Sequence, residues 1–187
     1  MKELITFGLW TIAIASQKID PAVEAEVQGR VAEVQGWAAD PTIVAAVLEA
    51  DGNLRSMDEI EEIDRDWQAA TGVTDFMRTL INHPASERLR ELRSSDPALQ
   101  EIFATDQLGA LVAATNKTSD FYQGDEEKFH EAFAEGKGGI HIGKLALDES
   151  IQSYSIPIGV PVLDQGKAIG VLVATLNVQK LKRKRGR

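Results

Sequence analysis

The chain has 187 residues, enough for one domain with a sizeable hydrophobic core. Its 20 Lys and Arg residues against 29 Asp and Glu give a formal net charge of −9, so no nucleic-acid partner is expected. The absence of cysteine excludes disulfides, thiol catalysis and cysteine-ligated metals, but it does not decide the cellular compartment.

The chain opens with an apolar run at residues 4–15. This run is too short to span a bilayer comfortably, but it fits the core of a signal peptide followed by the small residues Ala13 and Ala15. We interpret residues 1–16 as a signal peptide or a membrane-anchor remnant. An apolar first element that packs on the domain is the alternative.

The next segment has the pattern of a long helix. Asp20 and Pro21 form a helix start, with an acidic N-cap followed by proline at the first helical position. One apolar stripe then recurs at steps of three and four: Val23, Val27, Val31, Val34 and Ala38. The stripe predicts either a dimer contact or packing against the domain's own sheet.

Further helical segments follow. The Asp40-Pro41 pair interrupts the first helix, because proline cannot continue the hydrogen-bond ladder, and residues 42–50 form a second helical piece. Ser56 and Glu59 have the spacing of a capping box at the start of a helix over residues 56–70. Residues 75–81 and 86–93 are also amphipathic, so residues 20–95 form a helical part.

The second half of the chain has the pattern of two β-hairpins. Residues 102–104 and 110–114 flank a turn, and so do residues 158–163 and 168–176. Between the hairpins lie a polar loop, a short helix over residues 125–134 and a strand at residues 140–142. Helices followed by strands predict an α+β domain, and an insertion across an antiparallel sheet makes a concave site where small ligands bind.

No enzyme motif is present. The histidines His83, His130 and His141 belong to no nucleophile or metal-binding pattern, so we expect no catalytic residue, metal or cofactor. His130 is expected at the surface. The side chain of His141 points to the opposite face of its strand from those of Ile140 and Ile142, and so either to solvent or into the pocket.

The polar loop offers ligand-binding groups. Ser119, Asp120, Tyr122, Gln123 and Asp125 place hydroxyl, carboxylate, phenol and amide groups beside an aromatic pair. That pair is Phe129 and Phe133, and aromatic walls with a carboxylate suit an amine. Alternatively, Asp125 caps the helix that follows, and the two phenylalanines belong to the core.

Residues 101–176 resemble the Cache family, the PAS-like extracytoplasmic sensing domains of bacterial chemoreceptors, histidine kinases and cyclic-dinucleotide enzymes. The resemblance rests on the following residues and segments: 103–106 with Gly109, 112–113, Thr115, 118–126, Phe129 and Phe133, 136–139, 148–150, 161–162 and 169–172. It implies five antiparallel strands in a single sensor domain over residues 17–180, with the sheet core at 100–178. Phe129 stands where such domains often carry tryptophan.

The resemblance also implies a function. A Cache domain is not an enzyme; it binds a small molecule in the periplasm or elsewhere outside the cytoplasm and signals to an output protein, often as a homodimer through its long first helix. The resemblance assigns to the binding site Phe121, Tyr122, Asp125, His141, Asp148, Ser150 and Tyr154. The polar and aromatic groups of the loop add Asp120, Gln123 and Phe129 to the predicted site. The Arg-x-x-x-Trp clamp of amino-acid sensors is missing, so a carboxylate, an amine or another metabolite stays open.

Two further interpretations remain. Residues 181–187 form a basic end, which we expect to be a solvated tail, with contact to phosphates or anionic lipid as the alternative. The whole domain could also serve as a structural or dimerisation module whose pocket is vestigial and filled by side chains.

Overall fold

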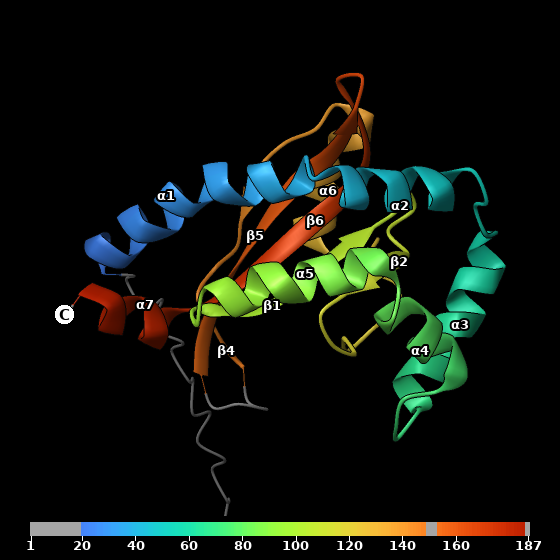
Figure 1. Ribbon diagram of the computed structural model, residues 1–187, viewed down its shortest axis with the longest axis horizontal. Coiled ribbons are helices and arrows are strands. Elements are labelled where there is room, and N and C mark those ends of the chain that lie inside the picture. Colours follow the sequence, from blue (N-terminus) through green and yellow to red (C-terminus); the bar gives the residue numbers. More distant parts are fainter. Residues whose placement is uncertain (1–19, 149–152, 186–187) are drawn as a thin grey trace, which may run out of the picture.

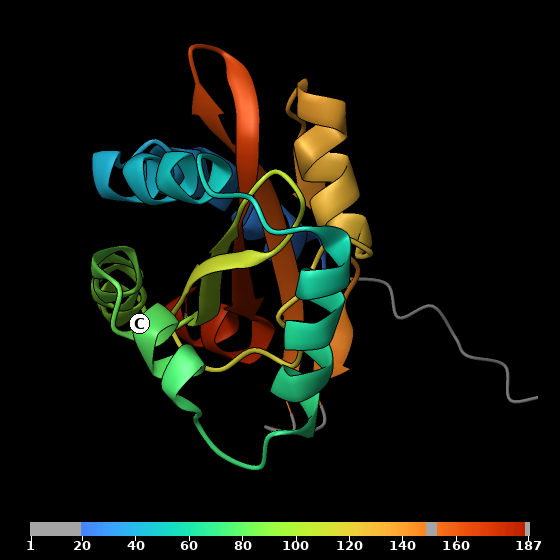
Figure 2. The ribbon, with the colours of Figure 1, turned by 90° about the vertical axis from the view of Figure 1, so that its right-hand side faces the viewer.

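The computed structural model describes residues 20–148 and 153–185, so the candidate signal peptide lies outside the described residues. It confirms the α+β fold class. One antiparallel sheet lies between two groups of helices (Figures 1 and 2). On one side are α1 (Pro21–Ala38), α2 (Pro41–Asp51) and α5 (Pro84–Ser95), and on the other are α3 (Met57–Ala69) and α6 (Glu127–Phe133).

The helices α1 and α2 begin at the two predicted Asp-Pro pairs. Helix α1 spans Pro21–Ala38 and α2 spans Pro41–Asp51, and the two run almost end to end in Figure 1. In each case an aspartate carboxylate accepts a hydrogen bond from a backbone N–H: Asp20 from Ala22 and Asp40 from Thr42, both at 2.9 Å. These bonds satisfy donors that the first helical turn leaves without a partner.

Three shorter helices follow. Helix α3 spans Met57–Ala69 and has the predicted capping box of Ser56 and Glu59, while α4 spans Asp75–Ile81. Helix α5 spans Pro84–Ser95 and so begins earlier than expected. The reason is that His83 acts as its N-cap, with Nδ1 accepting a hydrogen bond from the N–H of Ala85 at 3.2 Å.

Within the described residues, the sheet has six strands in five positions. Strands β1 (Leu99–Thr105), β2 (Leu111–Ala114), β5 (Ser153–Asp164) and β6 (Lys167–Asn177) form the two predicted hairpins. The order is β2-β1-β6-β5-β3. Two short strands, β3 (His141–Ile142) and β4 (Ala146–Asp148), pair with different parts of β5, so the last position holds one strand more than the predicted five.

The insertion between β2 and β3 contains the expected short helix. Helix α6 spans Glu127–Phe133, and a single 3-10 turn, η1, continues it over Ala134–Gly136. The N-cap position is Glu126, whose side chain makes no capping hydrogen bond, and Asp125 is exposed. Asp125 therefore does not cap α6.

Two hydrophobic cores fill the two faces of the sheet. The first lies under α1, α2 and α5 and contains the stripe residues Val23, Val27, Val34 and Ala38, so that stripe packs on the domain's own sheet. The second lies under α3, α4 and α6 and contains Trp67, Phe121 and Phe129.

The basic end of the chain differs from its expectation. Residues Val178–Arg185 form helix α7, which includes most of the expected tail, and Val178 and Leu181 are buried in the first core. The Asn177 side chain accepts a hydrogen bond from the N–H of Lys180 at 3.0 Å, which stabilises the start of the helix. Among the helices that the structure describes, none is long and apolar enough to cross a bilayer.

Candidate ligand-binding site

The predicted binding loop is fastened to helix α3. The Asp64 carboxylate accepts hydrogen bonds from the backbone N–H groups of Phe121 and Tyr122, at 2.7 and 3.0 Å. The indole N–H of Trp67 donates to the carbonyl of Thr118 at 2.9 Å. Hydrogen bonds to a charged acceptor are among the stronger ones in proteins, so α3 fixes the conformation of the loop.

The loop is also fastened to the β1–β2 turn. The Gln123 N–H donates to the carbonyl of Gly109 at 2.8 Å, and the Leu111 N–H donates to that of Phe121 at 3.1 Å. Gly109 has a φ of +88°, and a Cβ on it would lie 2.3 Å from the Cα of Gly124. Only glycine allows the loop and the turn to approach this closely.

Aromatic side chains fill the space under the loop. Phe121 is fully buried and lies 5.8 Å from the Trp67 ring and 5.6 Å from the Phe76 ring, measured between centroids. Phe129 is buried too and stacks on Phe133 at 5.3 Å. Phe121 and Phe129 are therefore core residues in this structure.

Helix α6 places a titratable pair beside β5. His141 is buried, and its Nδ1 lies 2.7 Å from a carboxylate oxygen of Glu131 on α6. His130, by contrast, is exposed, as the sequence predicted. His141 therefore points away from solvent, toward α6, and its role in ligand binding stays a prediction.

Of the remaining predicted site residues, Tyr154 lies on a different face. Tyr154 packs against the first core, on the opposite side of the sheet from Phe121 and Phe129. Asp148 ends strand β4, and Ser150 lies outside the described residues.

The polar loop residues mostly bond within the loop. The hydroxyls of Thr118 and Ser119 donate to the carbonyl and to the carboxylate of Asp120, both at 2.7 Å, and the buried Gln123 amide donates to the same carbonyl at 3.0 Å. Burial first, and then the nearby Asp125 carboxylate, raise the pKa of the half-buried Tyr122. These contacts account for the residue types of the loop without a ligand.

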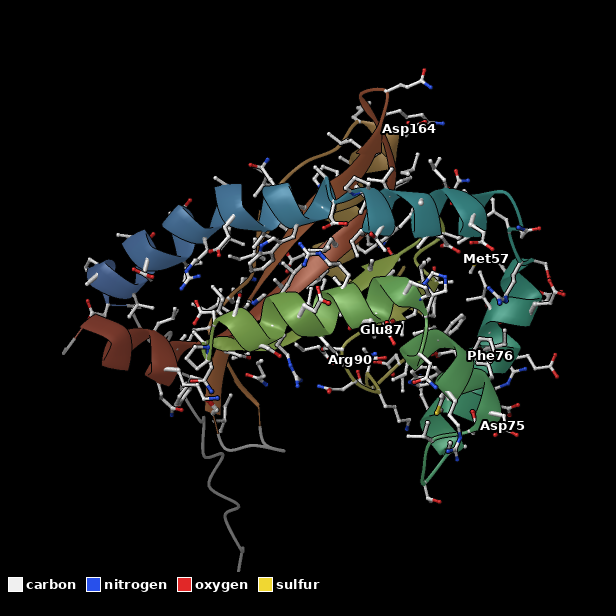
Figure 3. The ribbon with its side chains drawn as sticks, in the orientation of Figure 1. Met57, Asp75, Phe76, Glu87, Arg90 and Asp164 are labelled. Carbon is white, nitrogen blue, oxygen red and sulfur yellow. The ribbon has the colours of Figure 1, made fainter. Side chains whose placement is uncertain are left out.

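A cavity of about 290 Å³ opens beside the β1–β2 turn. It lies between α2, α4 and strand β2, near the corner where Figure 3 labels Phe76. Its lining combines apolar side chains with both signs of charge: Ala46, Glu49, Ala50, Asn53, Arg55, Phe76, Thr79, Leu80, His83, Asp106, Leu111 and Val112. A concave, partly apolar site with a few converging polar groups is the usual form of a small-molecule site.

Arg55 is the cation of this cavity. Its guanidinium carbon lies 5.7 Å from the centre of the Phe76 ring and 5.9 Å from that of Phe121, so two aromatic faces support it. Across residues 20–148 and 153–185, no side chain or carbonyl forms a hydrogen bond or ion pair with it. A guanidinium presents five N–H donors in a planar fork, which matches a carboxylate.

Asp106 is the buried anion of the cavity. One carboxylate oxygen accepts hydrogen bonds from the N–H groups of Leu108 and Ala110, at 2.9 and 3.0 Å. Burial raises the pKa of Asp106 despite these bonds, and the neighbouring Asp51 carboxylate raises it further. A protonated amine placed here would stabilise the ionised form.

His83 adds a donor to the cavity. Because its Nδ1 accepts a hydrogen bond from the N–H of Ala85, the neutral ring carries its proton on Nε2. The site therefore combines a cationic fork, an imidazole N–H and a buried carboxylate. No group of three or more His, Cys, Asp or Glu residues suited to a metal occurs in the described part of the chain.

Sequence reasoning did not single out this cavity. Arg55, His83 and Asp106 come from three separate segments, and each has a local reason to be where it is, in a loop, at a helix cap or in a turn. The sequence marks Asp106 only as a hairpin-turn residue and as part of the family resemblance.

The sequence matches no protein-family model and no curated protein. Solved structures of similar fold include the sensory domain of the Campylobacter jejuni chemoreceptor Tlp3 with isoleucine bound, at 16% identity and a TM-score of 0.42 over 89% of this chain and 67% of that one. The V. cholerae histidine kinase DctB sensor domain matches at 13% identity and 0.39, over 84% and 60%.

The ligand-binding domain of the Pseudomonas fluorescens chemoreceptor CtaA, in complex with L-serine, matches at 12% identity and a TM-score of 0.49, over 85% of this chain and 54% of that one. The chain thus spans 54% to 67% of the length of these three structures. All three are sensory or ligand-binding domains of bacterial receptors, and the likeness to this chain is one of fold.

Proposed function

We propose that the chain is a small-molecule-sensing domain of bacterial signal transduction, located outside the cytoplasm, which binds its ligand in the cavity between α2, α4 and β2. The observation that carries the proposal is the aromatic-backed guanidinium of Arg55, which makes no hydrogen bond or ion pair with the described residues. Arg55 is half-buried, and Asp106 and Glu59 attract it electrostatically, but its N–H donors have no acceptor among the described residues. A carboxylate ligand would supply that acceptor.

The charge of the cavity narrows the ligand class. Glu49 and Asp106 oppose the single cation Arg55, so a simple anion would meet net repulsion. A small zwitterion removes that conflict, because its carboxylate pairs with Arg55 while its ammonium approaches Asp106. The missing Arg-x-x-x-Trp clamp does not argue against such a ligand, since Arg55 offers the same chemistry from a different position.

A signal could leave the cavity through α2. This helix contributes Ala46, Glu49 and Ala50 to the lining and continues into α1 across Asp40. Arg88 on α5 donates to the Asp40 carboxylate at 2.7 Å, which ties the joint to the rest of the domain. Ligand binding that favours one position of α2 would therefore shift α1, the element expected to address an output protein.

The test is a thermal-shift screen of the full chain against amino acids, amines, small carboxylates and purines. A ligand at 100 times its Kd adds about 2.7 kcal/mol to the stability of the native state. Compounds with both a carboxylate and an amine are expected to raise the midpoint, and Arg55→Gln is expected to remove the shift.

Arg78→Gln is the matched control, because Arg78 is an exposed arginine of α4 outside the cavity lining. Two variants of the originally predicted loop site, Tyr122→Ala and Asp125→Ala, complete the set. If the loop variants lose binding but Arg55→Gln keeps it, the ligand binds at the loop and not in the Arg55 cavity.

A second candidate is a structural or dimerisation domain, and the aromatic filling under the loop favours it. Since the valine stripe of α1 is buried, a dimer through this helix would use its exposed face, which contains Ala25, Gly29, Ala32 and Gly36. Light scattering of Ala32→Glu against the unchanged chain tests this. The second candidate would be favoured if the folded protein shows no thermal shift with any compound and if Ala32→Glu converts an oligomer to a monomer.

A further inference from the structure

Helix α7 concentrates positive charge at one end of the domain. Of its eight residues, Lys180, Lys182, Arg183, Lys184 and Arg185 are basic and none is acidic. Val178 and Leu181 are buried, so the helix is held against the first core by its apolar residues. In Figure 1 it lies beside the first turns of α1, and the two helices are in contact.

A second cavity, of about 940 Å³, opens at the same end of the sheet. It is lined by the end of α5, the starts of β1 and β5, the end of β6 and the start of α7: Arg93, Ser94, Pro97, Leu99, Gln100, Ser153, Asn177, Gln179 and Lys180. The charged members of this lining, Arg93 and Lys180, are both cations. This cavity therefore has the opposite electrostatic character to the cavity at Arg55.

The polar wall of the second cavity is ordered by its own hydrogen bonds. The Asn177 amide donates to the Ser153 hydroxyl at 2.6 Å, and that hydroxyl donates to the Gln179 side chain at 2.8 Å. Arg93 donates from one nitrogen to the Asn116 side chain at 3.1 Å, and within the described residues it forms no ion pair. The remaining guanidinium donors and the exposed Lys180 ammonium stay available for an anion.

We propose that this end of the domain, the second cavity together with α7, binds the phosphate headgroups of an anionic phospholipid surface. Phosphate is the anion that arginine and lysine side chains bind best together, arginine through its fork and lysine as a point charge. Six of the twenty Lys and Arg residues lie in the last eight positions, which hold no acid.

A flat membrane fits this surface better than a nucleic acid does. The chain as a whole carries −9, so a long polyanion lying along the body would be repelled, whereas a membrane meets only the basic end. Salt screens charges beyond about 8 Å at physiological ionic strength, so the local patch decides the contact.

The test measures binding of the full chain to vesicles of phosphatidylcholine alone and to vesicles with about one third phosphatidylglycerol. Binding is expected to be stronger to the anionic vesicles and to weaken as salt is added. Because every variant keeps residues 1–19, any contribution of the apolar sequence cancels in the comparison. In the double variant Arg93→Gln/Lys180→Gln, affinity should fall by about fivefold for each cation removed.

Arg78→Gln/Lys137→Gln is the matched control, with the same change of charge at two exposed positions outside this cavity. It should keep the preference for anionic vesicles. A second variant, with residues 182–185 changed to glutamine, should lose the preference even if Arg93 proves important for folding. Both tests leave the Arg55 cavity intact, so ligand binding there should not change.

Equal binding to both kinds of vesicle would overturn the proposal, and so would an equal loss in the control, which would show that only net charge matters. Displacement of the vesicles by a DNA oligonucleotide at a similar charge concentration would point to a general polyanion site instead. Inorganic phosphate alone is expected to compete only weakly, because it engages one headgroup position and not the basic helix.

Discussion

The two faces of the sheet are built from different side chains. The buried members of the first core, under α1, α2 and α5, are all Val, Ala, Ile or Leu. The second core, under α3, α4 and α6, contains the buried aromatics Trp67, Phe103, Phe121 and Phe129. The aliphatic face joins regular helices to strands, whereas the aromatic face includes a loop that directional hydrogen bonds hold in place.

The two faces therefore differ in how they relate to the candidate ligand-binding site. Aliphatic packing is tolerant of small changes and fixes the helices α1 and α5 on the sheet. The aromatic face also supports Arg55, whose guanidinium lies over Phe76 and Phe121, so the packing beneath the loop and the candidate site share residues. The first core also reaches the cavity, through Ala46. Damage beneath Arg55 should therefore reach ligand binding, while equal damage at an aliphatic position outside the cavity lining should not.

The largest effect is expected from Phe121→Ala, which should lower the free energy of unfolding by about 3–5 kcal/mol, because a fully buried ring is removed. Ile158→Ala, at a fully buried position of the aliphatic face, should cost about 2–5 kcal/mol. Urea unfolding measures both. Only Phe121→Ala should speed hydrogen exchange at the Leu111 and Gln123 amides, and an equal effect of Ile158→Ala would mean that the two faces are not independent.

A smaller effect is expected when the hydrogen bonds between α3 and the loop are removed. Asp64→Ala leaves the N–H groups of Phe121 and Tyr122 without their acceptor and should cost about 2–3 kcal/mol. Asp64→Asn keeps an acceptor oxygen and should cost less. Glu62→Ala, at an exposed position of the same helix, is the control for a lost charge. If all three variants unfold at the same urea concentration, Asp64 does not hold the loop.

The smallest effect is on the pH dependence of stability, to which Asp106 and Asp40 should contribute with opposite signs. Burial raises the pKa of Asp106, so the folded state binds a proton more tightly than the unfolded chain does. Its contribution to stability is present at acidic pH and is lost as the pH rises through the raised pKa. Asp106→Asn should remove this loss and raise the melting midpoint near neutral pH.

Asp40 should behave in the opposite way. Burial acts to raise its pKa, but the hydrogen bonds from Arg88 and from the N–H of Thr42 outweigh it, and the pKa lies below its usual value. That stabilisation is present above the pKa of the unfolded chain and is lost as the pH falls through the lowered value. Melting curves of both Asn variants across the acidic range check the pair, and slopes of the same sign would contradict it.

How far the sequence predicts the molecule depends on how local the signal is. The Asp-Pro helix starts, the Ser56–Glu59 capping box and the turn at Gly166 follow from residues a few positions apart, and the structure confirms them. Tyr154 shows the limit, since its face depends on the alternation along β5, where it points with Ile156 and Ile158 into the first core.

The candidate site was out of reach for the same reason. Arg55, His83 and Asp106 come together only after α2, α4 and the β1–β2 turn have packed. No spacing in the sequence predicts that these three residues line one cavity. Helix α7 was missed because a basic end is usually solvated, whereas here Val178 and Leu181, three positions apart, give it one buried face.

The contact of Gly109 with Gly124 has a consequence for how the domain can diverge. Neither position lines the Arg55 cavity, yet a side chain at Gly109 would collide with backbone, and one at Gly124 would collide with the Leu108 carbonyl at 2.5 Å. Saturation libraries should therefore recover only glycine at both positions. Substitutions in the cavity could adapt the domain to a new ligand, whereas these two glycines would have to be retained for the loop and the turn to pack.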